Sequence, residues 1–254
     1  MIPISHHKTR HGEVVVLMSR STVAYWQDER HQSEADHAGI SLAAYIHAIH
    51  DFLRQAESRS VLMIGCGGGT LATMLGADGV KVSIVEINPR SFAISRRYFH
   101  LPDDVECHVS DGRAFLRASR RKYDAIVLDA YDGSRLPPQM RTPSFFNLVR
   151  SRLHPEHGVL FVNVVMRNDR DRHLDSVAAL MRKAFAEVRL LDAEGTIDRN
   201  AVAMAGAVGN LTPPTMTIRP RAGVRLLRQE IKAMAFRAPK EKAKRVARKV
   251  RKSR

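Results

Sequence analysis

Residues 61–70, VLMIGCGGGT, decide the fold, together with Glu86 at the end of a second apolar run. An unbroken apolar run such as residues 61–64 is typical of a buried parallel strand. The glycines that follow allow a tight turn and a close approach of a ligand to the backbone at the start of a helix. An acidic residue about 20 positions further on is where a ribose-binding carboxylate stands in nucleotide-binding βαβ units. We therefore predict a ligand that contains adenosine.

The spacing of the glycines narrows the class of ligand. Dinucleotide-binding turns usually read G-x-G-x-x-G, whereas this chain has Gly65, Gly67, Gly68 and Gly69. This departure, with Glu86 at the end of the second strand, favours a ligand of the S-adenosylmethionine type.

The rest of the chain alternates between strand-like and helix-like segments. Apolar runs at 80–86, 105–109, 125–128, 159–164, 188–191 and 201–205 are separated by expected helices at 89–99, 113–119, 144–153 and 174–185. This order predicts an α/β fold with a doubly wound, mostly parallel sheet. Ligands bind such sheets beyond the carboxyl ends of the strands. Glu86, Asp111 and Asp129 stand at three such ends, so we predict a site there, although Asp111 is equally suited to cap the next helix.

The segments before and after this domain are of different composition. Residues 1–34 are expected to hold a short β-hairpin, built from the β-rich runs 13–18 and 22–26, and residues 38–53 are expected to be helical. The α/β domain is expected to span 35–210. A Pro-rich extension with a short helix, 211–236, follows it. The remaining residues, 237–254, are expected to be a basic tail without fixed structure.

Charge and cysteine content limit the classes of partner. The tail, with ten Lys and Arg and one Glu, carries +9 of the total net charge of +15. This charge is compatible with a nonspecific contact of residues 237–254 with nucleic acid or an anionic surface. Cys66 and Cys107 have no metal-site spacing, so we expect no metal and a reducing, cytoplasmic location. No apolar run approaches the roughly 18 residues of a membrane-spanning helix.

Four segments carry a resemblance to a known family: GCGGG at 65–69, VEINP at 85–89, SDG at 110–112 and YDAIVLDAYD at 123–132. From about residue 12 to 205 the chain resembles the spermidine synthase-like polyamine aminopropyltransferases, which share the class I methyltransferase fold. The D-x-x-D motif of this family is matched by Asp129 and Asp132. The segment TPSFF at 142–146 is similar to the family's T-x-E-F-Y segment.

The resemblance implies an aminopropyl donor, decarboxylated S-adenosylmethionine, and a small-molecule amine as acceptor. It is also compatible with a homo-oligomer. Glu86 would bind the ribose hydroxyls, Asp111 the adenine amino group, and Asp129 would be the catalytic carboxylate. Asp132 would share in catalysis and hold the amine. The other implied site residues are Gly65, Gly67, Gly69, Gly112 and Gln32 for the donor, and Tyr45 and Tyr131 for the amine.

The chain departs from the family at Gly68, where the family has an aspartate that contacts the aminopropyl end of the donor. An alternative is therefore a methyltransferase that uses S-adenosylmethionine itself. A further alternative is a non-catalytic nucleoside-binding protein that acts through its basic tail.

Overall fold

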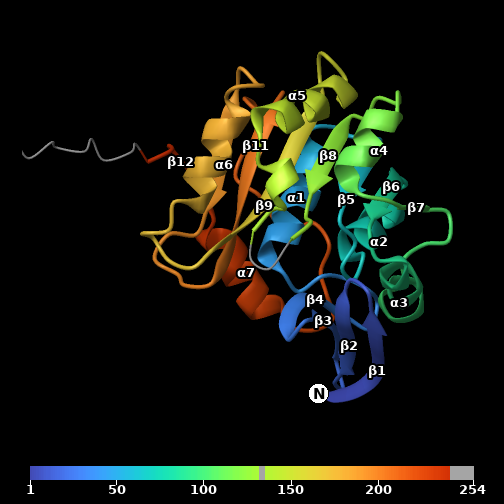
Figure 1. Ribbon diagram of the computed structural model, residues 1–254. Coiled ribbons are helices and arrows are strands. Elements are labelled where there is room, and N and C mark those ends of the chain that lie inside the picture. The colour runs from blue at the N-terminus through green and yellow to red at the C-terminus, as the bar shows by residue number, and fades with distance from the viewer. Residues whose placement is uncertain (132–134, 241–254) are drawn as a thin grey trace, which may run out of the picture.

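The structure, a computed structural model, describes residues 1–131 and 135–240 (Figure 1). Its centre is an eight-stranded sheet with the strand order β12-β10-β11-β9-β8-β5-β6-β7. The strands from β9 to β7 in this order are parallel, whereas β11, β10 and β12 extend the sheet with antiparallel pairs. The predicted doubly wound, mostly parallel α/β fold is confirmed.

From β5 to β11 the elements of this domain follow the predicted order along the chain, whereas β12 was not predicted. Its strands are β5 (Ser60–Ile64), β6 (Lys81–Glu86), β7 (Glu106–Val109), β8 (Ala125–Leu128), β9 (Val159–Met166), β10 (Val188–Asp192), β11 (Arg199–Gly206) and β12 (Ala235–Arg237). Its α-helices are α1 (Ala44–Gln55), α2 (Thr70–Ala77), α3 (Pro89–Phe99), α4 (Gly112–Ala118), α5 (Pro143–Arg152), α6 (His173–Met181) and α7 (Val224–Ala233), with a 3₁₀ turn, η1, at Pro138–Met140. The helix expected from residue 38 begins only at Ala44, because Asp36 accepts hydrogen bonds from the backbone N–H groups of Ala38 and Ile40 and holds residues 36–40 in a turn.

The strand order reverses between β5 and β8. The chain runs outward from β5 to β6 and β7, then returns to place β8 on the other side of β5. Open α/β sheets bind ligands at such a reversal, outside the carboxyl ends of the strands. In this chain these ends are Ile64 followed by Gly65, and Leu128 followed by Asp129.

Two apolar layers cover the faces of the sheet. Helices α1 and α2 pack on one face, where Phe52 of α1 stacks on Phe161 of β9 with the ring centroids 5.9 Å apart. Helices α4, α5 and α6 pack on the other face, with Phe145, Phe146 and Leu174 fully buried. Among the described residues, no helix is long and apolar enough to cross a membrane.

The N-terminal segment is a four-stranded antiparallel meander rather than a two-stranded hairpin. Its strands are β1 (Ile2–Thr9), β2 (Gly12–Met18), β3 (Thr22–Gln27) and β4 (Arg30–Asp36), in that order across the sheet. The runs at β2 and β3 were expected, but β1 and β4 were not. Most side chains of β1 are exposed or half-buried, and its backbone pairing with β2 holds it in place, so it lacks an apolar signal. This sheet packs on Ile94 and Phe99 of α3 at one end of the main sheet (Figure 1).

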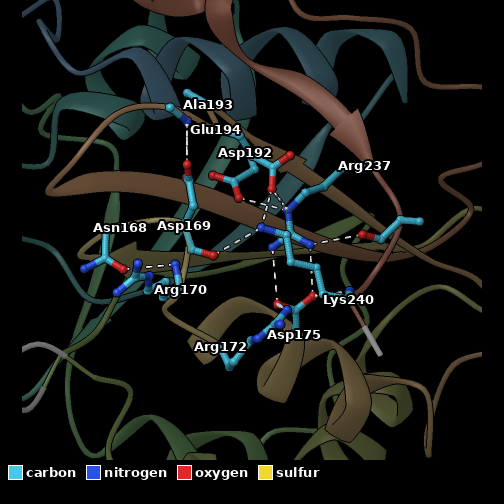
Figure 2. A network of polar contacts seen from close by, with 12 residues as sticks. Asn168, Asp169, Arg170, Arg172, Asp175, Asp192, Ala193, Glu194, Arg237 and Lys240 are labelled. Atoms are coloured by element: carbon cyan, nitrogen blue, oxygen red, sulfur yellow. Dashed lines mark hydrogen bonds and ion pairs between the residues drawn. The ribbon is translucent and has the colours of Figure 1, made fainter. Parts of the chain in front are cut away.

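The C-terminal edge of the main sheet is β12, which pairs with β10. Arg237, expected to begin the basic tail, lies in this strand instead. Its guanidinium donates to Asp192 of β10 and to Asp175 of α6, both at 2.9 Å (Figure 2). The backbone N–H of Lys240 also donates to Asp175, at 2.8 Å. Residues 237–240 of the predicted tail therefore pack on the domain, and the rest of the predicted tail, residues 241–254, lies outside the described part of the chain.

Candidate active site

The glycine turn between β5 and α2 brings two strand ends together. Gly65 has a φ of +101°, and a Cβ atom at this position would lie 2.2 Å from the carbonyl oxygen of Asp129. The backbone N–H of Asp129 donates to the carbonyl of Ile64 at 2.9 Å. Only glycine satisfies both the positive φ and this close approach. The turn thus places Asp129 directly beside the backbone of the glycine loop.

Glu86, at the end of β6, holds the same turn from the other side. Its carboxylate accepts hydrogen bonds from the backbone N–H of Cys66 at 3.0 Å and from that of Asn88 at 2.8 Å. Burial raises the pKa of Glu86, while these backbone hydrogen bonds act to lower it. Each carboxylate oxygen has more than one acceptor position, so Glu86 can bind the turn and a ligand hydroxyl together.

Two adjoining cavities meet at Asp129. The first, of about 200 Å³, is lined by the glycine turn, Glu86 and Asp28. The second, of about 380 Å³, is lined by Tyr45, Asn163 and Asn200 among others. Both cavities share the residues Arg30, Gln32, Ser33, Asp129 and Tyr131. Strand β4 of the N-terminal sheet therefore contributes to the walls of both cavities.

Asp129 is fixed by two hydrogen bonds. The Tyr45 hydroxyl donates to one of its carboxylate oxygens at 2.9 Å, and the Asn163 amide nitrogen donates to the other at 2.8 Å. Burial raises the pKa of Asp129, and the two donated hydrogen bonds act in the opposite direction. The result is an oriented carboxylate whose proton affinity is above that of an exposed aspartate.

Not every predicted site residue lines these cavities. Gly65, Gly67, Glu86, Gln32, Tyr45 and Tyr131 do. Gly69 is the N-cap of α2, and Gly112 begins α4. Asp111 is the N-cap of α4, where its carboxylate accepts from the backbone N–H of Ala114 at 2.9 Å. Asp132 lies outside the described residues.

Several residues that line the cavities were not predicted from the sequence, among them Asn163 and Ser33. Asn163 lies in the apolar strand β9, where a single amide among buried aliphatic residues was the available signal. Ser33 lies in β4, which showed no strand pattern, and its hydroxyl accepts from the backbone N–H of Gly68 at 3.0 Å. A Cβ atom on Gly68 would lie 2.9 Å from the Phe99 ring and 3.1 Å from the Ser33 Cβ. The position of the family aspartate is therefore closely packed in this chain.

The position of Asp129 suits a reaction of a positively charged substrate. A half-buried carboxylate attracts an ammonium group and can accept its proton. The cavity of the glycine turn is lined by glycine backbone, which a ligand can approach closely, and by the carboxylate of Glu86, which can bind the hydroxyls of a nucleoside. Among the described residues, no group of three or more His, Cys, Asp and Glu side chains is placed to hold a metal ion.

Comparison with known proteins gives relatives for part of the chain; no family model matches it. A probable polyamine aminopropyl transferase of Bifidobacterium longum is 40% identical over 115 residues, which are 44% of this chain and 26% of that protein. The polyamine aminopropyltransferase of Chromobacterium violaceum is 32% identical over 47% of this chain and 48% of its own length. An N-terminal histidine N-methyltransferase of Emericella nidulans is 31% identical over 46% of this chain and 22% of its own length. The matches thus span less than half the length of these relatives.

The solved structures show the same fold over most of the chain. A probable spermidine synthase from Corynebacterium glutamicum superposes with a TM-score of 0.74 over 92% of this chain and 90% of its own, at 16% identity. Human methyltransferase-like protein 13, solved with SAH, gives 0.53 over 80% of this chain and 95% of its own, at 23% identity. The chain therefore has the class I methyltransferase-like fold in the form found in spermidine synthases, and it is similar in sequence to polyamine aminopropyltransferases.

Proposed function

We propose that the chain transfers an aminopropyl group from decarboxylated S-adenosylmethionine to a di- or polyamine. The observation that carries this proposal is the position of Asp129 on the border between two cavities, one lined by Gly65, Gly67 and Glu86 and the other by Tyr45 and Asn163. A transfer between two small molecules requires such a shared border, because the reacting atoms must be held in contact and in line. The aminopropyltransferases among the relatives support the same reaction.

The chain's own residues would have the following roles. Glu86 would accept hydrogen bonds from the ribose hydroxyls, Gly65 and Gly67 would allow the donor to approach the backbone, and Gln32 would contact the donor from β4. Tyr45 and Tyr131 would line the amine cavity. Asp111 as a contact of adenine and Asp132 as a ligand of the amine remain predictions, as do Gly69 and Gly112 as contacts of the donor.

Asp129 would act as the general base. The amine nitrogen, once its proton has passed to the Asp129 carboxylate, attacks the methylene carbon bonded to the sulfonium sulfur. The new C–N bond forms as the C–S bond breaks, and its electron pair stays on sulfur in the departing methylthioadenosine. A positioned base of this kind contributes about 10²–10⁴-fold to the rate.

A second function, methyl transfer from S-adenosylmethionine, is favoured by one specific observation. Phe99 and Ser33 fill the space beside Gly68, so the acidic contact to an aminopropyl amine is not available from this position. Calorimetric titration with both sulfonium donors distinguishes the two functions. An aminopropyltransferase should bind the decarboxylated donor more tightly and release methylthioadenosine with a diamine. Preference for the intact donor, without methylthioadenosine release from the decarboxylated one, would favour the methyltransferase.

A further inference from the structure

The first part of the C-terminal extension, residues 212–221, runs along helix α1 without forming a helix or strand of its own. We call this segment the strap. Side chains of α1 hold it in turn: the backbone N–H of Thr212 donates to Gln55 at 2.8 Å, that of Thr215 donates to Asp51 at 2.8 Å, and the Thr217 hydroxyl lies 2.9 Å from Nδ1 of His50. The strap therefore runs antiparallel to α1, towards the N-terminal end of the helix.

At this end the strap binds Asp36, the last residue of β4. The Asp36 side chain is fully buried, and its Oδ2 accepts a hydrogen bond from the backbone N–H of Arg221 at 2.6 Å. Its Oδ1 accepts from the backbone N–H groups of Ala38 and Ile40, at 2.9 and 3.0 Å. One oxygen of this carboxylate thus holds the local turn, and the other holds the strap. A buried carboxylate depends on such donors, because loss of one leaves charge without a partner.

The turn that Asp36 closes connects two parts of the wall of the amine cavity, the second of the two cavities described above. The backbone N–H of Leu42 donates to the carbonyl of Glu34 at 2.9 Å, so the chain before the turn is bonded to the chain after it. Glu34, Leu42, Ala43 and Tyr45 line the amine cavity, and none of them lines the cavity of the glycine turn, which we call the nucleoside cavity. The position of this wall therefore depends on the turn.

We propose that Asp36 is a positioning residue for the amine, and that it makes the amine side of the site depend on the C-terminal extension. Asp36 itself lines neither cavity. It acts through the turn, which leads into α1 and so sets where the Tyr45 hydroxyl meets Asp129. A displacement of about 1 Å in a reacting group can cost up to about 10²-fold in rate. This inference rests on the proposed function for the identity of the ligand, but the contact with the strap can be measured without turnover.

The test breaks the contact between Asp36 and the strap from each side. Asp36→Asn has a single acceptor oxygen, so either the turn or the strap loses its acceptor. Arg221→Pro removes the N–H donor of the strap and leaves the carboxylate of Asp36 in place. In both variants, kcat/KM for a diamine should fall by at least about tenfold, while the affinity for the decarboxylated donor should change by less than about twofold. Initial rates of methylthioadenosine release at varied diamine give the first number, and calorimetry gives the second.

Asp51→Asn is the matched control. Asp51 is also a buried carboxylate that accepts a backbone N–H of the strap, but it lies in the second half of α1 and lines neither cavity. Asp51→Asn should lower the Tm, as Asp36→Asn does, and leave kcat/KM for the diamine unchanged. Equal kinetic losses in the two variants, or unchanged kinetics in folded Asp36→Asn and Arg221→Pro, would show that Asp36 only stabilises the fold and would overturn the inference.

Hydrogen exchange of backbone amides provides a readout that needs no substrate. Exchange in residues 41–45 and in the strap should become faster in Asp36→Asn and Arg221→Pro, because local opening follows the loss of the hydrogen bonds that hold a segment. In Asp51→Asn the faster exchange should leave residues 41–45 unaffected. If the wild type releases no methylthioadenosine with any amine, the proposed transfer reaction fails. The contact is then judged by exchange alone, and unchanged exchange of residues 41–45 in both Asp36→Asn and Arg221→Pro overturns it.

Discussion

Glu86 has two tasks in this structure, since its carboxylate binds the glycine turn through Cys66 and Asn88 and also lines the nucleoside cavity. Glu86→Ala removes both, so it should weaken binding of the decarboxylated donor by about 10- to 100-fold, for the loss of a charged hydrogen-bonding group. It should also lower the Tm, because two backbone N–H groups lose their acceptor. Calorimetry and thermal melting measure the two effects separately.

Glu106→Gln is the control, because Glu106 binds Ser83 and Arg121 outside the cavities. Unchanged donor affinity in folded Glu86→Ala would refute the ribose assignment.

Asp129 can be tested with a nearly isosteric change. Asp129→Asn keeps one oxygen that can accept from Tyr45 or Asn163, so the fold and donor binding should stay close to those of the wild type. Methylthioadenosine release should fall by at least about 10²-fold, because an amide neither attracts an ammonium group nor takes its proton. Single-turnover rates at saturating donor and amine give this number. Equal rates in both proteins would show that the base lies elsewhere and that Asp129 has only a structural role.

The pH dependence of the reaction should report the environment of Asp129. Burial raises its pKa, so the acidic limb of kcat/KM should lie at a higher pH than for an exposed aspartate. The hydroxyl of Tyr45 and the amide of Asn163 favour the ionised carboxylate. Tyr45→Phe and Asn163→Ala should therefore raise this pKa further and move the acidic limb to higher pH. A shift of the limb to lower pH would contradict this assignment of donors and acceptor.

At the scale of elements, Arg237 adds ion pairs to the backbone pairing that holds β12 on the sheet. The Arg237 side chain is 10% exposed, and its partners Asp175 and Asp192 are 9% and 1% exposed. Arg237→Leu leaves two buried carboxylates with fewer partners, which should cost about 3 kcal/mol and lower the Tm by about 6–12 °C. Deletion of residues 241–254 is the control and should leave the Tm nearly unchanged. A deletion as damaging as Arg237→Leu would show that residues 241–254 pack on the domain.

The ion pairs of Asp192 should make the stability of the fold depend on pH. Burial alone would raise the pKa of Asp192, but the hydrogen bonds from Arg199 and Arg237 hold it below its ordinary value. The stabilisation from this lowered pKa is complete at neutral pH and is lost as the pH falls through the pKa of the folded state. The Tm of Arg237→Leu should therefore fall less steeply with acid than that of the wild type.

The elements that the sequence predicts well are those with strong apolar periodicity. The strands at 61–64 and 125–128 and the glycine turn combine unbroken apolar runs with glycines of positive φ, and these signals are local. Strands β1 and β12 are edge strands held by backbone pairing and, at Arg237, by ion pairs. Such pairing depends on residues distant in the chain. Asn163 was missed for the same reason, since only the folded sheet brings it to Asp129.

At the scale of the whole molecule, the positive charge is densest in residues 241–254, which carry +7 of the net charge of +15. Residues 241–254 contain eight Lys and Arg and one Glu. We expect the full chain to bind duplex DNA or anionic vesicles with an affinity that falls steeply as salt increases, and the chain lacking 241–254 to lose most of this binding. Fluorescence anisotropy over a salt series measures it. Retained, salt-sensitive binding after the deletion would place the polyanion contact on the domain itself.

The whole molecule is also needed to enclose the site. Residues of β4 line both the nucleoside and the amine cavity, while Asp129, Tyr45 and Asn163 come from the α/β domain. The N-terminal sheet, packed on α3, is therefore part of the candidate active site as well as of the fold.

The place of β12 in the sheet has a consequence for biosynthesis. The outer edge of β10 is paired only by β12, which follows α7 in the chain and is therefore synthesised last among the described elements. A chain still on the ribosome, with residues 235–240 inside the exit tunnel, presents the unpaired edge of β10, and the carboxylates of Asp175 and Asp192 lack their contacts with Arg237. Open strand edges recruit other chains, and domains begin to fold while translation continues. Nascent or prematurely terminated chains that lack these six residues should therefore be substrates for chaperones and proteases.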